Sequence, residues 1–228
     1  MLYFLVYNDN THNIHIDRLL KSVQEYGKEF EIIIFNKSDI DVEFMNKNKD
    51  ILDLQRGGGY WLWKPYIINK TLEKIKDRDI IFYLDSKYYF LEKFQGLYKD
   101  YMKNNDLLIW KNKPNWPIFY MKNWCKMDVI LKYNMFDKIF REHIEDSWAG
   151  ALVIKKSKKT IKFIQDWLDM SSIYEDITDS ESKNKNIVLF NEHRHDQSLL
   201  SILVHKNNIP LQFFENKYLQ NVRNPFLV

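Results

Sequence analysis

The sequence contains a single cysteine, Cys125, among its 228 residues. One cysteine excludes an internal disulfide framework and any zinc site built from four cysteines. Such a sequence favours a reducing, cytoplasmic setting. We interpret Cys125 as a small buried apolar residue, because no second cysteine and no placed base accompanies it.

Long apolar runs are also absent. The longest one beyond the N-terminal stretch, residues 199–204, is interrupted by Ser201 and is far shorter than the roughly 18 to 20 residues that a transmembrane helix requires. The N-terminal residues 1–7 carry no basic side chain, and they are too few for a signal peptide. The sequence therefore predicts a cytoplasmic protein whose only membrane contact is peripheral, at the cytoplasmic face.

Neither sign of charge dominates, since 34 lysine and arginine residues stand against 31 aspartate and glutamate residues, a formal net charge of +3. This near balance argues against a surface built to bind nucleic acid. Hydrophobic residues make up 45% of the chain and aromatic residues 16%, a composition that excludes disorder as the dominant state. A chain of this length can bury a full core without disulfide or metal support.

Short apolar segments alternate with longer segments of helical periodicity, a pattern typical of βα units around a mostly parallel sheet. Strands are predicted at residues 2–7, 30–35, 79–85, 107–110 and 148–154, and helices at 16–26, 65–75, 91–103 and 160–168. No repeat and no long linker divides the chain, so we expect a single α/β domain over residues 1–228. The polar tract 171–186 is the candidate for a mobile loop.

Three segments depart from this patterning, and the first covers residues 56–65. It contains three of the six glycines of the chain, immediately before two tryptophans, a lysine and the start of a helix. Backbone N–H groups, a cation and the positive end of a helix then converge, which suits a phosphate or diphosphate group. The alternative is a tight turn followed by aromatic core packing, because a glycine triplet alone is a weak motif.

The second segment is the apolar strand that ends at Asp85 and is followed by Ser86 and Lys87. In an open parallel sheet this strand end faces the ligand crevice, where a carboxylate can hold a divalent cation or a sugar hydroxyl. The alternative is that Asp85 caps the next turn.

The third segment, Glu192-His-Arg-His-Asp-Gln-Ser198, precedes an apolar helix. Asp196 is well placed to be the N-cap of that helix. Two imidazoles, a guanidinium and a carboxylate in succession exceed what a cap requires, so we favour a functional role. We expect Asp85 and Asp196 to lie on opposite sides of one crevice.

Together with Trp148-Ala-Gly-Ala-Leu-Val-Ile-Lys-Lys-Ser157, these segments resemble a family of small bacterial and viral glycosyltransferase-like proteins. The resemblance covers roughly residues 1–210, and its most specific element is Gly-Tyr-Trp-x-Trp-Lys-Pro. It implies a GT-A-like (Rossmann-like) fold with a mostly parallel sheet flanked by helices. The implied activity is transfer of a sugar from a nucleotide-diphospho-sugar donor to a glycan or glycolipid acceptor, in capsule or lipopolysaccharide synthesis.

Two other classes of function stay open at this point. The first is a non-catalytic member of the same fold that binds a sugar nucleotide or glycan. The second is a nucleic-acid binder that uses aromatic residues interleaved with lysine and arginine. The near-neutral charge argues against the second, so we expect no nucleic-acid partner.

The resemblance also implies site residues. Asp85, Asp196 and His195 are the candidates for catalysis, with Asp146 as another carboxylate in reach of such work. The aromatic residues of the first segment are expected to stack on the base or the sugar, and the cations are expected to neutralise the departing diphosphate. The expected donor-binding residues are Arg56, Gly57, Gly58, Gly59, Tyr60, Trp61, Trp63, Lys64, Lys87, Trp148, Gly150, Arg194 and Gln197.

One departure from the family pattern concerns the metal. Metal-dependent GT-A enzymes usually present Asp-x-Asp at this strand end, whereas this chain has Asp85-Ser-Lys87. A lysine repels a divalent cation and can itself neutralise a diphosphate leaving group. Mn²⁺ or Mg²⁺ bound at Asp85 and a metal-independent site are therefore both open alternatives.

Overall fold

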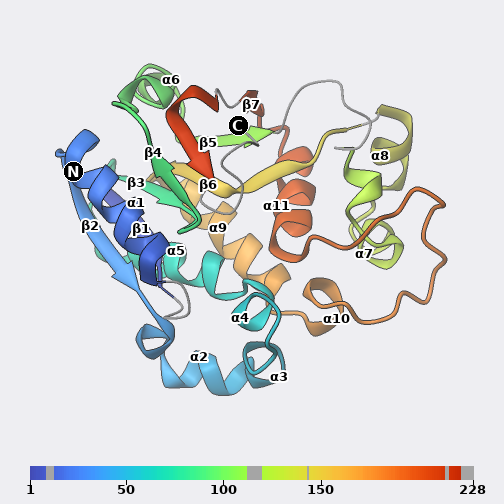
Figure 1. The fold of residues 1–228 in the computed structure, drawn as a ribbon. Coiled ribbons are helices and arrows are strands. Elements are labelled where there is room, and N and C mark those ends of the chain that lie inside the picture. Colours follow the sequence, from blue (N-terminus) through green and yellow to red (C-terminus); the bar gives the residue numbers. More distant parts are fainter. Residues whose placement is uncertain (9–12, 112–119, 143, 214–215, 222–228) are drawn as a thin grey trace.

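The computed structural model describes residues 1–8, 13–111, 120–142, 144–213 and 216–221 (Figure 1). Its strands are β1 Leu2–Tyr7, β2 Phe30–Phe35, β3 Ile80–Leu84, β4 Tyr88–Phe90, β5 Leu107–Lys111, β6 Ser147–Lys155, β7 Gln212–Phe213 and β8 Leu219–Asn221. Its α-helices are α1 Asn13–Tyr26, α2 Val42–Lys47, α3 Lys49–Leu52, α4 Gly57–Tyr60, α5 Trp63–Lys74, α6 Tyr101–Asn104, α7 Met127–Lys132, α8 Phe136–Glu142, α9 Lys158–Ser171, α10 Tyr174–Ile177 and α11 His195–Lys206.

Six strands form the central sheet in the order β2-β1-β3-β6-β5-β7. β1 runs parallel to β2 and β3, and β5 runs parallel to β7, whereas β6 is antiparallel to both of its neighbours. A separate small sheet pairs β4 with β8. The prediction of a mostly parallel sheet flanked by helices is confirmed, with β6 as the antiparallel strand in its middle.

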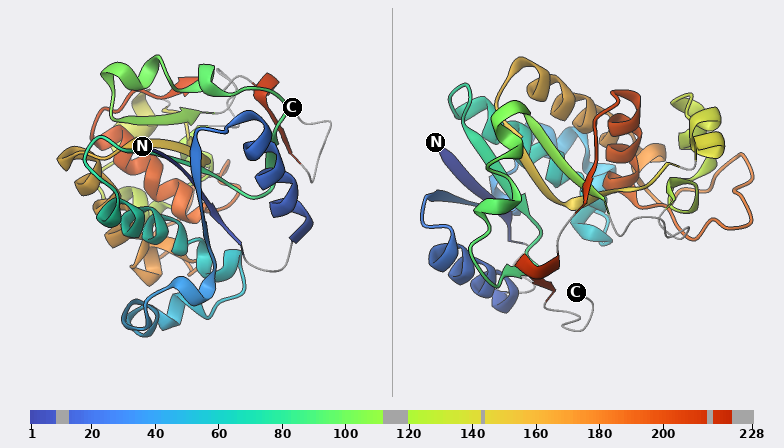
Figure 2. Two further views of the ribbon diagram at one scale, coloured as in Figure 1. Left: turned by 90° about the vertical axis from the view of Figure 1, so that its left-hand side faces the viewer. Right: turned by 90° about the horizontal axis from the view of Figure 1, so that it is seen from above.

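Both faces of the central strands β1, β3, β5 and β6 are buried, since successive side chains point to opposite faces and enter different hydrophobic clusters. On one face Leu5, Tyr83 and Leu152 pack with α5, α9 and α11. On the other face Phe4 and Phe82 pack with α1 and β4. The left view of Figure 2 shows α1 on one side of the sheet and α5, α9 and α11 on the other. Burial on both faces explains why the strands are nearly continuous apolar runs in the sequence.

The prediction of a continuous helix over residues 91–103 is wrong. The segment instead contains a short 3₁₀ helix, Gln95–Leu97, and the four-residue helix α6. Phe94 is wholly buried and stacks on Phe90 with their ring centroids 3.6 Å apart. This packing of aromatic rings overrides the helical periodicity of the segment.

The polar tract 171–186 contains α10, so the expectation of a loop is wrong for residues 174–177. Ile177 is wholly buried. The buried Lys126 ammonium donates to the carbonyl oxygen of Thr178 at 3.1 Å and to the hydroxyl of Ser180 at 2.9 Å. These contacts attach the first half of the tract to the core, and its mobility stays a prediction.

No helix among the described residues is both long enough and apolar enough to cross a membrane.

A pair of leucines tests the assignment of the core. Leu152 is wholly buried in β6, whereas Leu189 is 64% exposed. We expect Leu152→Ala to lower the free energy of unfolding by about 2–5 kcal/mol, because it removes transfer energy and leaves a cavity. The matched Leu189→Ala should change it by less than about 0.5 kcal/mol. Equal losses in urea unfolding would contradict this placement of β6.

Candidate functional site

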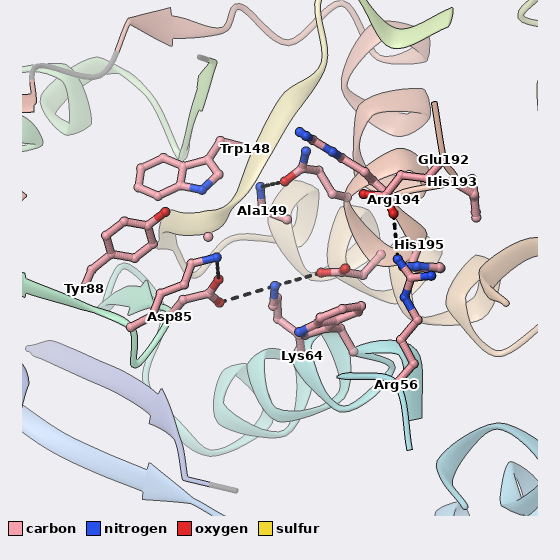
Figure 3. Close-up of a pocket in the computed structure, with 15 residues that line it drawn as sticks. Arg56, Lys64, Asp85, Tyr88, Trp148, Ala149, Glu192, His193, Arg194 and His195 are labelled. Atoms are coloured by element: carbon pink, nitrogen blue, oxygen red, sulfur yellow. Dashed lines mark hydrogen bonds and ion pairs between the residues drawn. The ribbon is translucent and has the colours of Figure 1, made fainter. Parts of the chain in front are cut away.

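A pocket of about 400 Å³ brings the three sequence segments together (Figure 3). The predicted site residues that line it are Arg56, Trp61, Lys64, Asp85, Lys87, Trp148, Gly150, Arg194, His195, Asp196 and Gln197. The lining residues that were not predicted as site residues are Tyr88, Ala149, Glu192 and His193. The predicted residues that do not line it are Gly57, Gly58, Gly59, Tyr60 and Trp63.

Asp85 follows the carboxyl end of β3, and its backbone N–H donates to the carbonyl oxygen of Gly150 in β6 at 2.8 Å. The Tyr83 hydroxyl donates to Asp85 Oδ1 at 2.7 Å. The ammonium of Lys64 lies 3.4 Å from Oδ1, and that of Lys87 lies 3.7 Å from Oδ2. Burial alone raises the pKa of Asp85, but the two ammonium charges outweigh burial and hold the pKa below its ordinary value. Asp85 is therefore ionised.

The glycine triplet forms a left-handed turn. Residues 57–61 all have positive φ, with values of 51° at Tyr60 and 60° at Trp61. This conformation raises the free energy of a non-glycine residue by about 1–2 kcal/mol. A Cβ on Gly57 would lie 2.5 Å from the Trp61 ring, so the turn requires glycine there.

Residues 57–60 of this turn do not line the pocket. The N–H groups of Tyr60 and Trp61 donate to the carbonyl oxygens of Arg56 and Gly57, at 2.7 and 3.3 Å. These two donors are used inside the turn, and phosphate binding by the rest of the turn stays a prediction. Its effect is to aim Trp61 at the pocket and to start α5, which carries Lys64.

Lys64 joins two carboxylates. Only 3% of the residue is exposed, and its ammonium lies 2.8 Å from Asp196 Oδ2 in addition to its contact with Asp85. Burial lowers the pKa of Lys64, but the charges of Asp196 and Asp85 outweigh burial and raise it, so the ammonium is charged. Asp85 and Asp196, which lie far apart in the sequence, therefore share one crevice as expected.

Asp196 does not cap α11, contrary to the sequence interpretation. The N-cap position is occupied by Arg194, and Asp196 lies inside the first turn. Burial raises the pKa of the Asp196 carboxyl to about 6, against the opposing charge of Lys64, and the negative charge of Asp85 adds to the rise. The carboxylate is directed to Lys64 because α11 begins four residues earlier than the apolar pattern suggested.

Two histidines fix the start of α11. His193 Nε2 donates to the carbonyl oxygen of Asp176 at 2.7 Å, and His195 Nδ1 donates to that of Ile177 at 2.7 Å. A carbonyl oxygen can only accept, so both tautomers are assigned by these contacts. Burial lowers the pKa of both imidazoles, which are neutral. His195 Nε2 keeps a lone pair and lies 3.8 Å from Asp179 Oδ1.

Arg56 and Arg194 occupy different parts of the rim. Arg56 donates to Asp179 and to Glu192, each at 2.8 Å, and so ties the turn to two other segments. Arg194 places its guanidinium 3.5 Å over the ring of Trp124. A role for either side chain in donor binding stays a prediction.

Behind Arg194 lies the wholly buried Asp146, which accepts hydrogen bonds from Gln197 and, at 2.7 Å, from Ser201. Burial raises the pKa of Asp146 to about 6, and the Arg194 charge opposes the rise. Gln197 in turn accepts from the backbone N–H of Ala149 at 3.3 Å. These bonds attach α11 to β6.

The aromatic wall of the pocket differs from the predicted one. Trp63 stacks on Tyr7 with ring centroids 3.9 Å apart and is 8% exposed, so it belongs to the core. Trp148 instead meets Tyr88 edge to face, with centroids 5.2 Å apart. A Cβ on Gly150 would overlap the Trp148 ring, which explains the glycine. The signal missed was an aromatic residue directly after Asp85-Ser-Lys87.

The residues present do not fit a divalent metal ion. Within the described ranges, no three histidine, cysteine, aspartate or glutamate side chains are grouped to hold one. Ion binding at Asp85 would place two further positive charges beside Lys64 and Lys87, which already lie against its carboxylate.

No protein-family model matches the sequence, and no curated protein sequence is significantly similar to it. Solved structures do share the fold. The bifunctional glycosyltransferase WbbM has a TM-score of 0.56 at 11% identity, over 94% of this chain and 39% of that one. An active-site mutant of LgtC has a TM-score of 0.50 at 17% identity, over 89% of this chain and 70% of that one. The chain spans about two fifths of WbbM, and its fold is that of GT-A-type glycosyltransferases.

Two glycines with the same φ of +60° test the left-handed turn. At Gly58 a Cβ would meet only the Trp63 indole nitrogen, at an ordinary contact distance of 3.7 Å. Gly58→Ala should therefore lower the free energy of unfolding by about 1–2 kcal/mol, from the backbone conformation alone. Gly57→Ala adds the collision with Trp61 and should cost more in urea unfolding. Equal losses, or a stabilising Gly57→Ala, would contradict the turn.

The raised pKa of Asp146 predicts a pH dependence of stability. Between the unfolded value of about 4 and the folded value of about 6, the folded state binds more protons, so this carboxyl makes stability fall as pH rises. Relative to Asp146→Asn, the wild type should lose up to about 1.4 kcal/mol per pH unit from pH 4 to 6. Urea unfolding at each pH measures this, and parallel profiles for the two proteins would refute it.

Proposed function

We propose that this protein transfers a sugar from a nucleotide-diphospho-sugar donor to a glycan or glycolipid acceptor. The observation that carries the proposal is one pocket in which Asp85 and Asp196 lie among cationic side chains, on a GT-A-type fold. A fold alone does not define an activity, so the argument rests on the chemistry of this pocket.

Sugar transfer from such a donor requires stabilisation of the departing diphosphate. Three cationic side chains of the pocket are accessible, Arg56 at 43%, Lys87 at 36% and Arg194 at 28%. Arg56 already donates to Asp179 and Glu192, so we consider Lys87 and Arg194 for the diphosphate. In Figure 3 Asp85, which is the ion-pair partner of Lys87, and the Arg194 side chain lie on different sides of the open space. We assign the diphosphate to this space, where both cations reach it.

Among the candidate catalytic residues, Asp85 is the most accessible. Its side chain is 18% exposed, against 5% for Asp196 and 3% for His195. Asp85 is therefore assigned to touch the substrate, as the ionised carboxylate that binds a sugar hydroxyl or accepts the acceptor proton. Asp196 and His195 act behind it, through Lys64 and the start of α11.

Trp148 and Tyr88 form the wall assigned to the flat faces of the donor. Aromatic rings pack well against a base or the apolar face of a sugar. This assignment moves the stacking role from Trp63 to residues that line the pocket.

We further assign the reaction to surface polysaccharide synthesis, on the resemblance of the sequence motifs. Residues 1–228 would act as one glycosyltransferase domain in the cytoplasm, in peripheral contact with a membrane that carries a glycolipid acceptor.

The test begins with calorimetric titration of UDP-, GDP-, CMP- and dTDP-sugars into the wild type, followed by an assay for released nucleotide with glycan and glycolipid acceptors. Lys87→Ala should weaken the binding of the recognised donor about 10- to 100-fold, because it removes a charge-assisted contact of about 1.5–3 kcal/mol. Lys162→Ala, on the exposed face of α9, is the matched control and should leave affinity unchanged.

Each result bears on the proposal. Failure of every donor to bind would refute it. Binding without nucleotide release, whatever acceptor is added, would support the alternative of a non-catalytic sugar-nucleotide-binding protein. Equal affinity of the wild type and Lys87→Ala would remove Lys87 from the donor site.

A further inference from the structure

We propose that the Lys64 ammonium occupies the place of a divalent cation between two carboxylates, so that the pocket binds its donor without a metal ion. This inference rests on the proposed function and deepens it by naming the cation on which the site is organised. It is carried by the arrangement of Lys64, Asp85 and Asp196.

The geometry resembles that of a bound ion. One nitrogen atom lies 2.8 Å from Asp196 Oδ2 and 3.4 Å from Asp85 Oδ1. Figure 3 shows Lys64 beside Asp85, with a dashed line for the interaction between them. The carboxylates come from α11 and from the end of β3, so a single positive charge joins two elements that are not neighbours in the sequence.

Lys64 is built into the core and is not a surface lysine that folds inward. Its side chain is 4% exposed and leaves the first turn of α5, directly after the left-handed turn. The ammonium lies 5.6 Å from the ring centroid of Tyr83 and 5.8 Å from that of Trp63. Aromatic faces attract a cation, so they complete a cage whose other sides are the two carboxylates.

The charges in the cage are already balanced. Asp85 and Asp196 face Lys64 and Lys87, which gives equal numbers of carboxylates and ammonium groups. A divalent ion could reach both carboxylates only by displacing the buried ammonium of Lys64. Removing that ammonium while leaving its apolar stem would expose two carboxylate ligands of the kind that Mn²⁺ and Mg²⁺ prefer.

Lys64 is a positioning residue under this proposal. It keeps Asp85 ionised and oriented toward the pocket, while Lys87 and Arg194 meet the diphosphate. A merely structural lysine would affect stability, but its removal would not create a metal site, and this difference makes the proposal testable.

The first measurement uses the wild type. Donor affinity, measured by calorimetry, should be the same in EDTA as in excess Mn²⁺. Electron paramagnetic resonance of Mn²⁺ titrated into the protein without donor should show no ion bound in this pocket. Donor binding that requires Mn²⁺ would overturn the proposal.

The second measurement uses Lys64→Met, which keeps most of the stem and removes the charge. This variant should acquire bound Mn²⁺ in the resonance titration and a higher melting temperature with Mn²⁺, because a ligand that binds the folded state stabilises it. Its donor affinity should fall about tenfold or more in EDTA and recover with Mn²⁺. The control is Lys64→Met combined with Asp196→Asn, which should no longer bind the ion. Its loss would show that the Mn²⁺ acquired by Lys64→Met is bound in this pocket and not by surface carboxylates.

A folded Lys64→Met protein that binds no Mn²⁺ would overturn the proposal. If the variant does not fold, the wild-type comparison decides, since equal affinity in EDTA and Mn²⁺ supports the proposal and a metal requirement refutes it. If the proposed function is wrong, no donor binds under any condition. The Mn²⁺ titration of Lys64→Met needs no donor, so it still tests the role of Lys64 in that case.

Discussion

The contact of Lys64 with Asp85 and Asp196 is the interaction on which the pocket depends. It joins the first turn of α5, the end of β3 and the first turn of α11, and the pocket lies where these elements meet. Buried ion pairs contribute little net stability, because desolvation offsets their attraction, but removing one partner is costly. Such a contact therefore defines where the elements meet more than it holds the fold together.

Backbone strain occurs on both sides of this contact. Tyr60 and Trp61 adopt positive φ before α5, and His195 does so at the start of α11, with φ of 51°. The Trp61 ring stacks on His195, with centroids 5.5 Å apart, so the two strained places support one another. Strained conformations persist where surrounding packing over-determines them, and they cluster at binding and catalytic sites. Here they orient Lys64 and Asp196 toward each other.

Particular residues show how much of the site could be predicted from the sequence. It grouped Asp85, Lys64 and Asp196 correctly, because each follows or opens an apolar element whose end must lie at the edge of the core. It misjudged Trp63, since an aromatic residue beside a glycine turn has the same local pattern whether it stacks on Tyr7 or on a ligand. Tyr88 was not predicted as a site residue, because its place beside Trp148 depends on a contact between β4 and β6.

The sequence by itself determined the α/β alternation, the positions of β1 and β2 to the residue, and the three segments that form the pocket. These follow from apolar periodicity and from glycine and charge placement, which are local properties of the chain. Only the tertiary structure decided the antiparallel direction of β6, the breakdown of the predicted helix at residues 91–103, and the partner of Asp196. Each of these depends on contacts between residues far apart in the sequence, whose packing and charge outweigh local preference.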